Sequence, residues 1–413
     1  MRARVFAVSL GVVGVLGGIT FSGSALAAPS AAGHRHPSGP VHCDGVSRKG
    51  IASCSAVQLS ETSAWRGHHI RGARTTAPAG YGPADLQQAY DLTAASADKG
   101  KGATVAIVDA YDDPAALYDL AIYRAEWGLP PICSGWSTTG CVRFTKVNQN
   151  GATSPLPEPD AAWSQETSVD VDAVSAICPN CNILLVESNA ASLKSLGKAE
   201  NAAAAADPVA IGNSYGVSET ASETTADIDY THPGIAVTAA TGDDGYGVQY
   251  PATSPGVIAV GGTTLDQSTG TSRGWSETAW SGDGSGCSTI EPQPAWQSAV
   301  SALASVCTER AVADVAAVAD PTTGIAVYDT FGLNGWNVFG GTSVATQIIA
   351  AVYALGGGVA RSPGASGLYK ASPADFYNIT SGSDGTCGSV LCTAATGWNG
   401  PTGLGTPDGT AAF

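Results

Sequence analysis

The residues whose types and spacing suggest chemistry are two acidic residues and one serine. Glu166 and Asp170 are four positions apart, so they project from the same side if this segment is helical. Ser343 closes a Gly-Gly-Thr-Ser sequence and precedes an apolar run over 344–355, which places a nucleophile near a helix amino terminus. Beyond residue 80 the chain has one histidine, His232. The combination predicts a serine peptidase whose base is a carboxylate rather than an imidazole.

A third carboxyl group follows a run that is typical of a buried strand. Asp243 belongs to a glycine-flanked turn directly after the apolar residues 235–238, and the Asn-Ser-Tyr-Gly sequence 213–216 follows a similar run at 209–211. Functional loops of parallel sheets lie beyond the carboxyl ends of their strands. We therefore expect both loops to lie at the same edge of a sheet.

The elements that must position these groups alternate along the chain. Short apolar runs predict strands at 104–108, 182–186, 209–211, 235–238 and 257–260, and the longer stretches between them predict helices at 114–127, 163–177 and 191–206. Apolar strands alternating with helices are typical of a parallel sheet covered on both faces. The sequence thus predicts an α/β fold with a doubly wound, mainly parallel sheet.

Three segments differ in composition. Residues 1–27 have early arginines, an apolar run and small residues at the end, which is typical of a secretory signal peptide. Residues 28–80 have little apolar periodicity and are expected to form a short prosegment or linker that buries little core. Residues 81–413 are long enough for a single large domain. We expect a secreted, extracellular protein without a membrane span.

Charge is unevenly distributed between these segments. Residues 28–80 have 6 basic and 2 acidic residues, whereas residues 81–413 have 11 basic against 33 acidic residues, a formal net charge of −22. Such a surface repels nucleic acid and anionic lipid. We therefore expect neither nucleic acid nor membrane as a partner, and we expect a monomer.

The ten cysteines fall into five pairs that are close in sequence. Cysteines of exported proteins form disulfides because the environment is oxidising. Proximity in sequence predicts the disulfides Cys43–Cys54, Cys133–Cys141, Cys178–Cys181, Cys287–Cys307 and Cys387–Cys392. Spacing alone does not determine connectivity. For Cys178 and Cys181, a redox-active dithiol is the alternative.

In their order along the chain, the motifs resemble those of one family, the sedolisins, which are secreted serine-carboxyl peptidases with a subtilisin-like fold. The similar sequences run from about Tyr81 to Phe413 and comprise Glu166-x-x-x-Asp170, Gly242-Asp243-x-Gly245, Tyr250-Pro251-Ala252-x-Ser254-Pro255, Ala259-Val260-Gly261-Gly262-Thr263 and Gly340-Gly341-Thr342-Ser343.

The resemblance implies a role for each acidic residue. Ser343 corresponds to the nucleophile, Glu166 to the general base, Asp170 to the residue that orients the glutamate, and Asp243 to the acid of the oxyanion hole. Glu166 must be ionised to accept a proton, whereas Asp243 must be protonated to donate a hydrogen bond. We therefore expect hydrolysis of protein or peptide substrates with an acidic optimum, and loss of activity as Asp243 ionises.

The resemblance also implies binding residues. Ser214, Tyr215 and Gly216 correspond to the segment that pairs with an extended peptide substrate, although an ordinary turn is the alternative. The family's calcium site has two aspartates where this chain has Asn378 and Asn399. With the Ile379 carbonyl, these would be the ligands. Because both charges are missing, we expect weak or no calcium binding and no other cofactor.

Two further differences from the family concern Gln347 and the prosegment. Gln347 replaces a proline that is common four residues after the nucleophile, and we expect the effect to be structural and small. The segment 28–80 is shorter than the family's folded prodomain. It could cover the site until it is cleaved near residues 74–81.

Two alternative interpretations remain open. Asp109, His232 and Ser343 could form a subtilisin-type triad, although Pro233 directly after the histidine does not match the helix start of such enzymes. The chain could also be a catalytically inactive secreted pseudopeptidase that serves as a binding or structural module.

Overall fold

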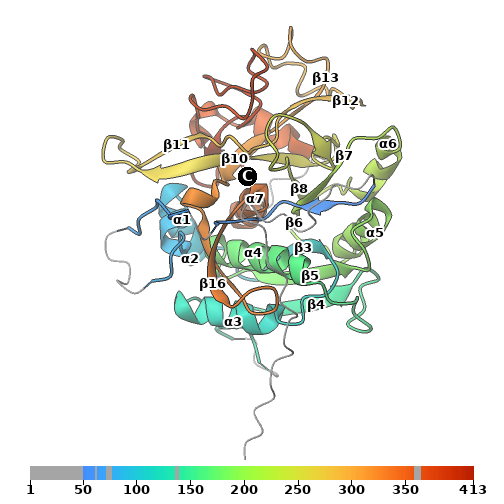
Figure 1. The fold of residues 1–413 in the computed structure, drawn as a ribbon, viewed down its shortest axis with the longest axis vertical. Coiled ribbons are helices and arrows are strands. Elements are labelled where there is room, and N and C mark those ends of the chain that lie inside the picture. The colour runs from blue at the N-terminus through green and yellow to red at the C-terminus, as the bar shows by residue number, and fades with distance from the viewer. Residues whose placement is uncertain (1–49, 61–62, 71–76, 135–138, 358–363) are drawn as a thin grey trace, which may run out of the picture. The chain divides into compact units, whose positions relative to one another are not determined.

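The computed structural model describes residues 50–60, 63–70, 77–134, 139–357 and 364–413 (Figure 1). Contacts divide the chain into residues 1–37 and residues 38–413. The first unit lies outside the described residues, as does the predicted signal peptide. The description below concerns the second unit.

The centre of this unit is an eight-stranded sheet. Along the sheet the strands are β4 (Phe144–Asn148), β5 (Asn182–Ser188), β3 (Thr104–Ala110), β6 (Ala210–Asn213), β8 (Ala236–Ala240), β10 (Ile258–Gln267) and β11 (Trp275–Ala279), and β14 (Val315–Val318) also pairs with β10. Every pairing is parallel except that of β10 with β11. The predicted α/β fold with a mainly parallel sheet is confirmed.

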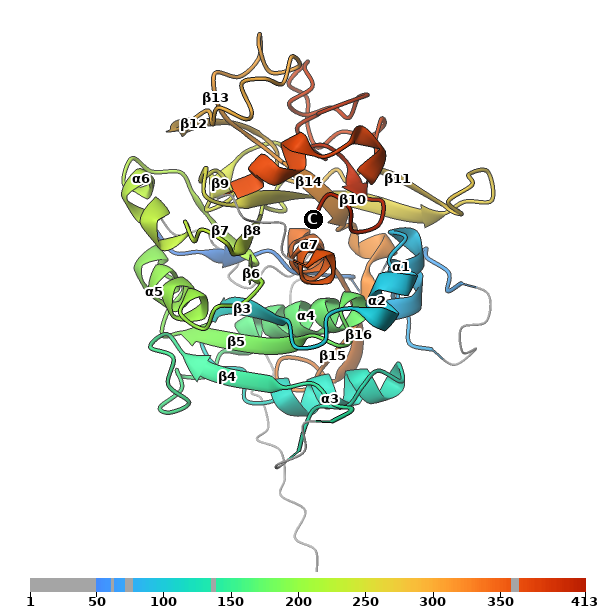
Figure 2. The same ribbon diagram turned by 180° about the vertical axis from the view of Figure 1, so that it is seen from behind.

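Helices cover both faces of the sheet (Figures 1 and 2). They are α1 (Pro83–Ala89), α2 (Thr93–Asp98), α3 (Ala116–Glu126), α4 (Ala161–Ile177), α5 (Leu193–Ala204), α6 (Glu223–Ala226) and α7 (Thr342–Gly356). Alternate residues of a strand face opposite sides. Accordingly, Val105 and Ile107 of β3 join the core cluster that contains residues of α4 and α7, whereas Ala106 and Val108 join the cluster that contains residues of α5.

Smaller sheets surround this core. One contains β1 (Ser53–Cys54), β7 (Tyr215–Ser218) and β9 (Gln249–Tyr250), and another contains β2 (Val57–Gln58), β16 (Gly335–Gly340) and β15 (Ile325–Asp329). Two-stranded sheets pair β12 (Gly286–Pro292) with β13 (Glu309–Val312), and β17 (Phe376–Tyr377) with β18 (Thr406–Pro407). Short 3-10 helices occupy Asp227–Asp229, Pro321–Thr323, Gly364–Lys370 and Pro373–Asp375.

The stretch around β1 and β2 corrects one expectation. Ala52, Cys54, Ala56 and Val57 are at most 3% exposed, so this part of the segment 28–80 is buried rather than a loose linker. Val57 packs with Trp280 and with the main domain's Ala319. Whether the prosegment ends at residue 80 stays a prediction.

Four of the five predicted disulfides are confirmed. They are Cys133–Cys141, Cys178–Cys181, Cys287–Cys307 and Cys387–Cys392. The predicted Cys43–Cys54 pair stays a prediction, because Cys43 lies outside the described residues. Cys178 and Cys181 are fully buried, which favours a structural disulfide over the redox alternative because a redox pair must meet its partner thiol.

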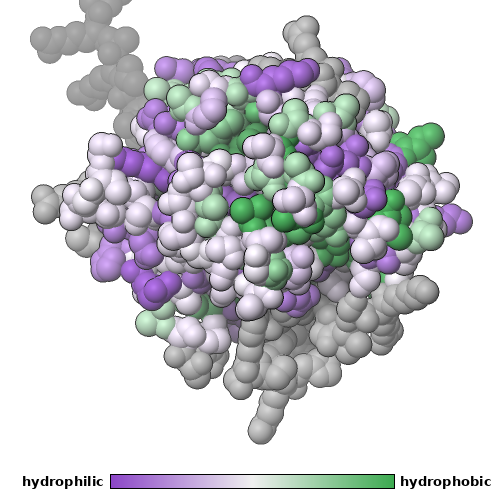
Figure 3. Space-filling view, turned by 90° about the horizontal axis from the view of Figure 1, so that it is seen from above, coloured by the Kyte–Doolittle hydropathy of each residue, from purple (hydrophilic) through white to green (hydrophobic). Residues whose placement is uncertain are grey.

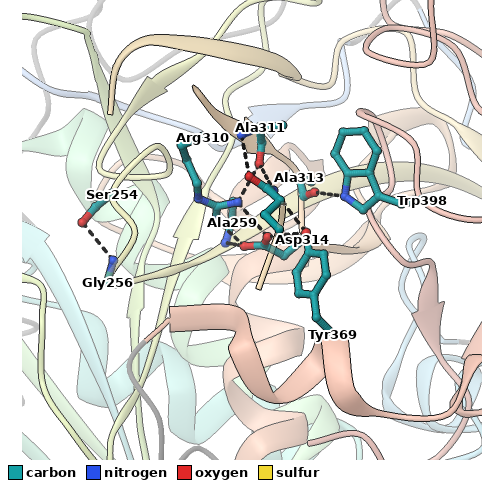
Figure 4. Close-up of polar contacts among 10 residues, drawn as sticks. Ser254, Gly256, Ala259, Arg310, Ala311, Ala313, Asp314, Tyr369 and Trp398 are labelled. Atoms are coloured by element: carbon teal, nitrogen blue, oxygen red, sulfur yellow. Dashed lines mark hydrogen bonds and ion pairs between the residues drawn. The ribbon is translucent and has the colours of Figure 1, made fainter. Parts of the chain in front are cut away.

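A buried ion pair joins the C-terminal third of the chain to the sheet (Figure 4). Arg310 and Asp314 are both fully buried and form two hydrogen bonds of 2.8 and 2.5 Å. Asp314 also accepts hydrogen bonds from the Ala259 backbone N–H at the start of β10 and from the Tyr369 hydroxyl. These contacts pair the two buried charges, which is the condition for tolerating them in a core, while Arg310 Nε has no hydrogen-bond partner among the described residues.

Polar and apolar residues are interspersed on the face drawn in Figure 3. The large hydrophobic residues with the most exposed side chains are Leu117, Tyr118, Ile228 and Tyr246, and scattered apolar residues are ordinary on soluble surfaces. Within the described residues, no helix has the length and apolar character needed to cross a membrane.

Candidate active site

Ser343 lies in the first turn of α7. Gly341, the residue before the helix, has a φ of 94°, a conformation that glycine adopts without strain. A Cβ at this position would also stand 2.0 Å from the backbone oxygen of Ser55. The glycine therefore lets another backbone approach the serine closely. Ser343 is fully buried, and its hydroxyl donates a 3.4 Å hydrogen bond to the Ser214 carbonyl.

Glu166 and Asp170 come from α4, which packs against α7. The helix is capped by Asp160, whose carboxylate accepts hydrogen bonds from the Ala162 and Trp163 amides. Its predicted helical structure is confirmed, and the spacing of four puts both acidic residues on one side. Glu166 is hydrogen-bonded to Ser343 and to Asp170. The carboxyl group is thus in place to exchange a proton with the serine.

Burial shifts the titration of these two acids. Removal from water raises the pKa of Glu166 well above its ordinary range, the nearby charge of Asp109 raises it further, and the hydrogen bond to Ser343 opposes the shift. Burial, Asp109 and Glu166 likewise raise the pKa of Asp170. Because neighbouring buried carboxyls resist double ionisation, protons are shared within the cluster.

Asp109 is a member of this cluster that sequence reasoning placed only in the alternative triad. It is fully buried near the end of β3 and accepts a 3.0 Å hydrogen bond from Thr167, the residue after Glu166. Burial raises the pKa of Asp109 to about 7. The position of Asp109 near the carboxyl end of a predicted strand could have identified it from the sequence as a candidate site residue.

Asp170 has two further partners. Its Oδ1 accepts a 2.9 Å hydrogen bond from the Ser214 hydroxyl, and its Oδ2 accepts a 2.6 Å hydrogen bond from Nε2 of Gln347. The expectation that Gln347 matters only for helix structure is therefore wrong. Gln347 lies one helical turn after Ser343, so its side chain projects from the same side of α7, where its amide fixes Asp170.

Asp243 approaches Ser343 from the turn after β8. Its Oδ1 accepts hydrogen bonds from the Thr342 amide, 2.7 Å, and from the Thr342 hydroxyl, 2.9 Å. Its Oδ2 is buried and has no hydrogen-bond partner among the described residues. Burial raises the pKa of Asp243 to about 8, against the hydrogen bonds from Thr342. In mildly acidic solution Oδ2 therefore holds a proton that it can donate.

The predicted substrate-binding residues Ser214, Tyr215 and Gly216 pair with part of this chain. Tyr215 and Gly216, in β7, pair antiparallel with Cys54 and Ser53 of β1. A Cβ on Gly216 would stand 2.0 Å from the side chain of Gln249. The segment thus has the backbone pairing expected of a site for extended peptides.

His232 has a different set of contacts. Its Nε2 is 2.9 Å from the Asp229 carbonyl oxygen and 3.9 Å from Glu200. Burial lowers the pKa of His232. The structure gives the alternative triad of Asp109, His232 and Ser343 no support, because the His232 ring bonds the Asp229 carbonyl and the acid that interacts with Ser343 is Glu166.

The residues at the expected calcium position do not fit a cation. The Asn399 amide Nδ2 donates to the carbonyls of Ile379, 3.2 Å, Ala395, 3.1 Å, and Gly397, 3.4 Å, while Asn378 exchanges two hydrogen bonds with Gly397. An N–H group points at carbonyl oxygens that a cation would need as ligands. In the described part of the chain, no group of three or more His, Cys, Asp or Glu residues could hold a metal ion.

Comparison with known proteins gives related sequences over most of the chain. Kumamolisin from Bacillus sp. strain MN-32 is 30% identical over 377 residues, which cover 81% of this chain and 63% of kumamolisin. Sedolisin from Pseudomonas sp. strain 101 is 27% identical over 80% of this chain and 60% of its own. This chain is thus similar to kumamolisin and to sedolisin over about four fifths of its length. It spans less than two thirds of the length of either relative. No family profile matches it.

Solved structures show a similar likeness. The Pseudomonas sedolisin, a serine-carboxyl proteinase complexed with two molecules of pseudo-iodotyrostatin, matches with a TM-score of 0.67 and 25% identity, over 80% of this chain and 96% of that one. The S41 psychrophilic protease matches with a TM-score of 0.50 and 16% identity over 81% of this chain and 99% of that one. The second match is informative about the fold alone, which is subtilisin-like.

Proposed function

We propose that this chain is a secreted serine-carboxyl endopeptidase that hydrolyses peptide bonds in acidic solution. The observation that carries this proposal is the position of Ser343 between two acids. Glu166 is hydrogen-bonded to the serine, and Asp243 lies beside it with a buried Oδ2 that is free of hydrogen-bond partners among the described residues. One acid is thus in place as a base and the other as a donor.

In the proposed reaction, Glu166 accepts the hydroxyl proton as Ser343 Oγ attacks the substrate carbonyl carbon. The oxyanion receives hydrogen bonds from the Ser343 backbone N–H and from protonated Asp243. Glu166 then gives its proton to the leaving amine, which leaves an ester on Ser343. Water then hydrolyses the ester: Glu166 accepts a proton from the attacking water molecule and gives it to Ser343 Oγ. Asp170 holds Glu166 in position and shares its proton.

A cavity beside Asp243 supports the second half of this reaction. Its volume is about 710 Å³, and its lining includes Asp243, Gln58 and Trp280. Glu166, Asp170 and Ser343 are themselves fully buried. The cavity therefore provides space for water next to Asp243.

The test is digestion of an unfolded protein or a peptide library between pH 3 and pH 8. We expect cleavage in acidic solution by the natural chain and none by Ser343→Ala. Glu166→Gln should lose about 10³-fold or more in kcat, because the amide cannot accept the proton. His232→Ala is the matched control and should retain activity.

Two outcomes would contradict the proposal. Activity that still increases at pH 8, where about half of the Asp243 carboxyls would be ionised, would exclude an oxyanion donor that must be protonated. A natural chain that folds and binds peptides without cleaving them would instead favour the interpretation as an inactive binding module.

A further inference from the structure

A segment of the chain itself runs through the cleft at Ser343. In Figure 1 this blue segment, which follows residue 50, crosses the middle of the molecule past α7. The Ala52 N–H donates to the Ala191 carbonyl, Ser53 and Cys54 pair antiparallel with Gly216 and Tyr215, and the Ser55 N–H donates to the Ser214 carbonyl at 3.1 Å. This is the arrangement in which an extended peptide substrate would bind.

The Ser55 carbonyl lies where a scissile carbonyl must lie. Its oxygen accepts a 3.1 Å hydrogen bond from the Ser343 backbone N–H. The same oxygen and Asp243 Oδ2 both lie within 2.9 Å of the point that a Cβ on Gly341 would occupy. The carbonyl oxygen is therefore hydrogen-bonded to one oxyanion donor and lies near the other, and this carbonyl belongs to the Ser55–Ala56 peptide bond.

The chain after this bond is held just as firmly. In β2, Val57 pairs with Gly340 and Gln58 pairs with Phe339, and the Leu59 N–H donates to the Val338 carbonyl at 2.8 Å. Pairing on both sides fixes the bond as it would fix a bound substrate. Because Ser343 is fully buried under this segment, an external peptide cannot reach it at the same time.

Residues 65–69, which follow this segment, pack against the rest of the domain. The Trp65 ring lies 5.4 Å from the Tyr81 ring, and its Nε1 donates to the Gly324 carbonyl. His69 bonds Asp85 at 2.7 Å. The predicted cleavage region, residues 74–81, has different contacts at its end. Tyr81 is fully buried and pairs with Ile325 of β15.

We propose that the chain cleaves its own Ser55–Ala56 bond and that the residues after Ala56 remain part of the mature body. This inference rests on the proposed function. Ser343 Oγ bonds to the Ser55 carbonyl carbon and its proton passes to Glu166. The bond to the Ala56 nitrogen then breaks, and that nitrogen takes the proton. Water hydrolyses the resulting ester, which leaves a carboxyl group on Ser55, an amino group on Ala56 and the serine restored.

The experiment follows the N-terminus of the full chain after a shift from neutral to acidic solution, by intact mass and N-terminal sequencing. We expect the natural chain to begin at Ala56 and Ser343→Ala to remain uncut. Ala56→Pro should lose this cut, because a tertiary amide replaces the leaving N–H. Thr75→Pro makes the same change in the predicted region 74–81 and should be cut normally. Cleavage within one molecule also requires a rate constant that does not change on dilution.

Outcomes that overturn this inference differ from those that overturn the proposed function. A chain that digests an added unfolded protein but begins at a residue other than Ala56 refutes the processing site and leaves the peptidase proposal standing. A cut after Ser55 in Ser343→Ala shows that another enzyme makes it. A natural chain that neither processes itself nor digests added protein contradicts both. If Ala56→Pro does not fold, the mass of the processed natural chain still locates the cut.

Discussion

At the scale of single residues, the acids around Ser343 are held in surroundings that favour their protonated forms. Burial is the largest cause of the raised pKa of Glu166, Asp170 and Asp243. A raised pKa serves the donor Asp243 directly. For the base it means that activity begins only when the cluster has lost a proton, which limits activity at the most acidic pH.

Asp243→Asn should remove the alkaline decline of activity. The donor is the protonated carboxyl, which is present below the pKa of about 8 and is lost as pH rises through it. An asparagine keeps an acceptor for Thr342 and presents an N–H to the oxyanion at every pH. The measurement is kcat/KM against pH. Asp243→Ala, which has no donor, should lose about 10²–10³-fold in kcat at its optimum. An unchanged alkaline decline in Asp243→Asn would exclude Asp243 as its cause.

Gln347→Met should shift the acidic limb of the profile to higher pH. The substitution keeps most of the side-chain volume but removes the 2.6 Å hydrogen bond that stabilises ionised Asp170. The cluster would then release its proton less readily. The pH profile of kcat is the informative measurement, because a purely structural role would lower activity or stability without moving the limb. Ser214→Ala removes the other donor to Asp170 and should shift the limb in the same direction.

At the scale of elements, the sequence predicted the long ones well. The longer stretch at 163–177 predicted α4 correctly, and the apolar runs predicted the central strands. It did not predict β1 and β2, because each has two residues, and so short a strand has no periodicity to detect. Their partners are distant in sequence, and only the folded chain shows that Cys54 meets Tyr215. The same limit hid the contact of Gln347 with Asp170.

The loops that replace the family's calcium site should be stable without metal. In the natural chain the Asn399 amide already satisfies the carbonyls of Ile379, Ala395 and Gly397. We expect a chelator to leave the melting temperature unchanged. The double substitution Asn378→Asp with Asn399→Asp should lower the melting temperature in chelator and raise it when Ca²⁺ is added. A fall in the melting temperature of the natural chain on chelation would contradict this expectation.

At the scale of the whole molecule, buried carboxyls should make the protein more stable in acid than at neutral pH. Burial raises the pKa of Asp113 and of Glu200 to about 8, whereas the same groups titrate near 4 in an unfolded chain. Between these values the folded state binds protons that the unfolded state does not, so stability is greatest below about pH 4 and falls as pH rises, by roughly 1.4 kcal/mol per pH unit for each such group.

Urea unfolding at pH 4 and pH 8 measures this effect. The midpoint should be lower at pH 8, and Glu200→Gln should reduce the difference because an amide does not titrate. Lys198→Gln, on the same helix, is the matched control and should leave the difference unchanged. A midpoint that rises with pH would show that these carboxyls are ionised in the folded protein.

The segment 52–59, which covers Ser343, also affects how the uncut chain binds soluble ligands. A segment tethered beside its own binding cleft competes at an effective concentration in the millimolar range. The effective concentration of the tethered strand would therefore exceed that of a free peptide at micromolar concentration by about a thousandfold. Inhibitor screens against the uncut protein would miss compounds that occupy the same cleft, whereas an active-site titrant added over time would count only the molecules whose strand has left.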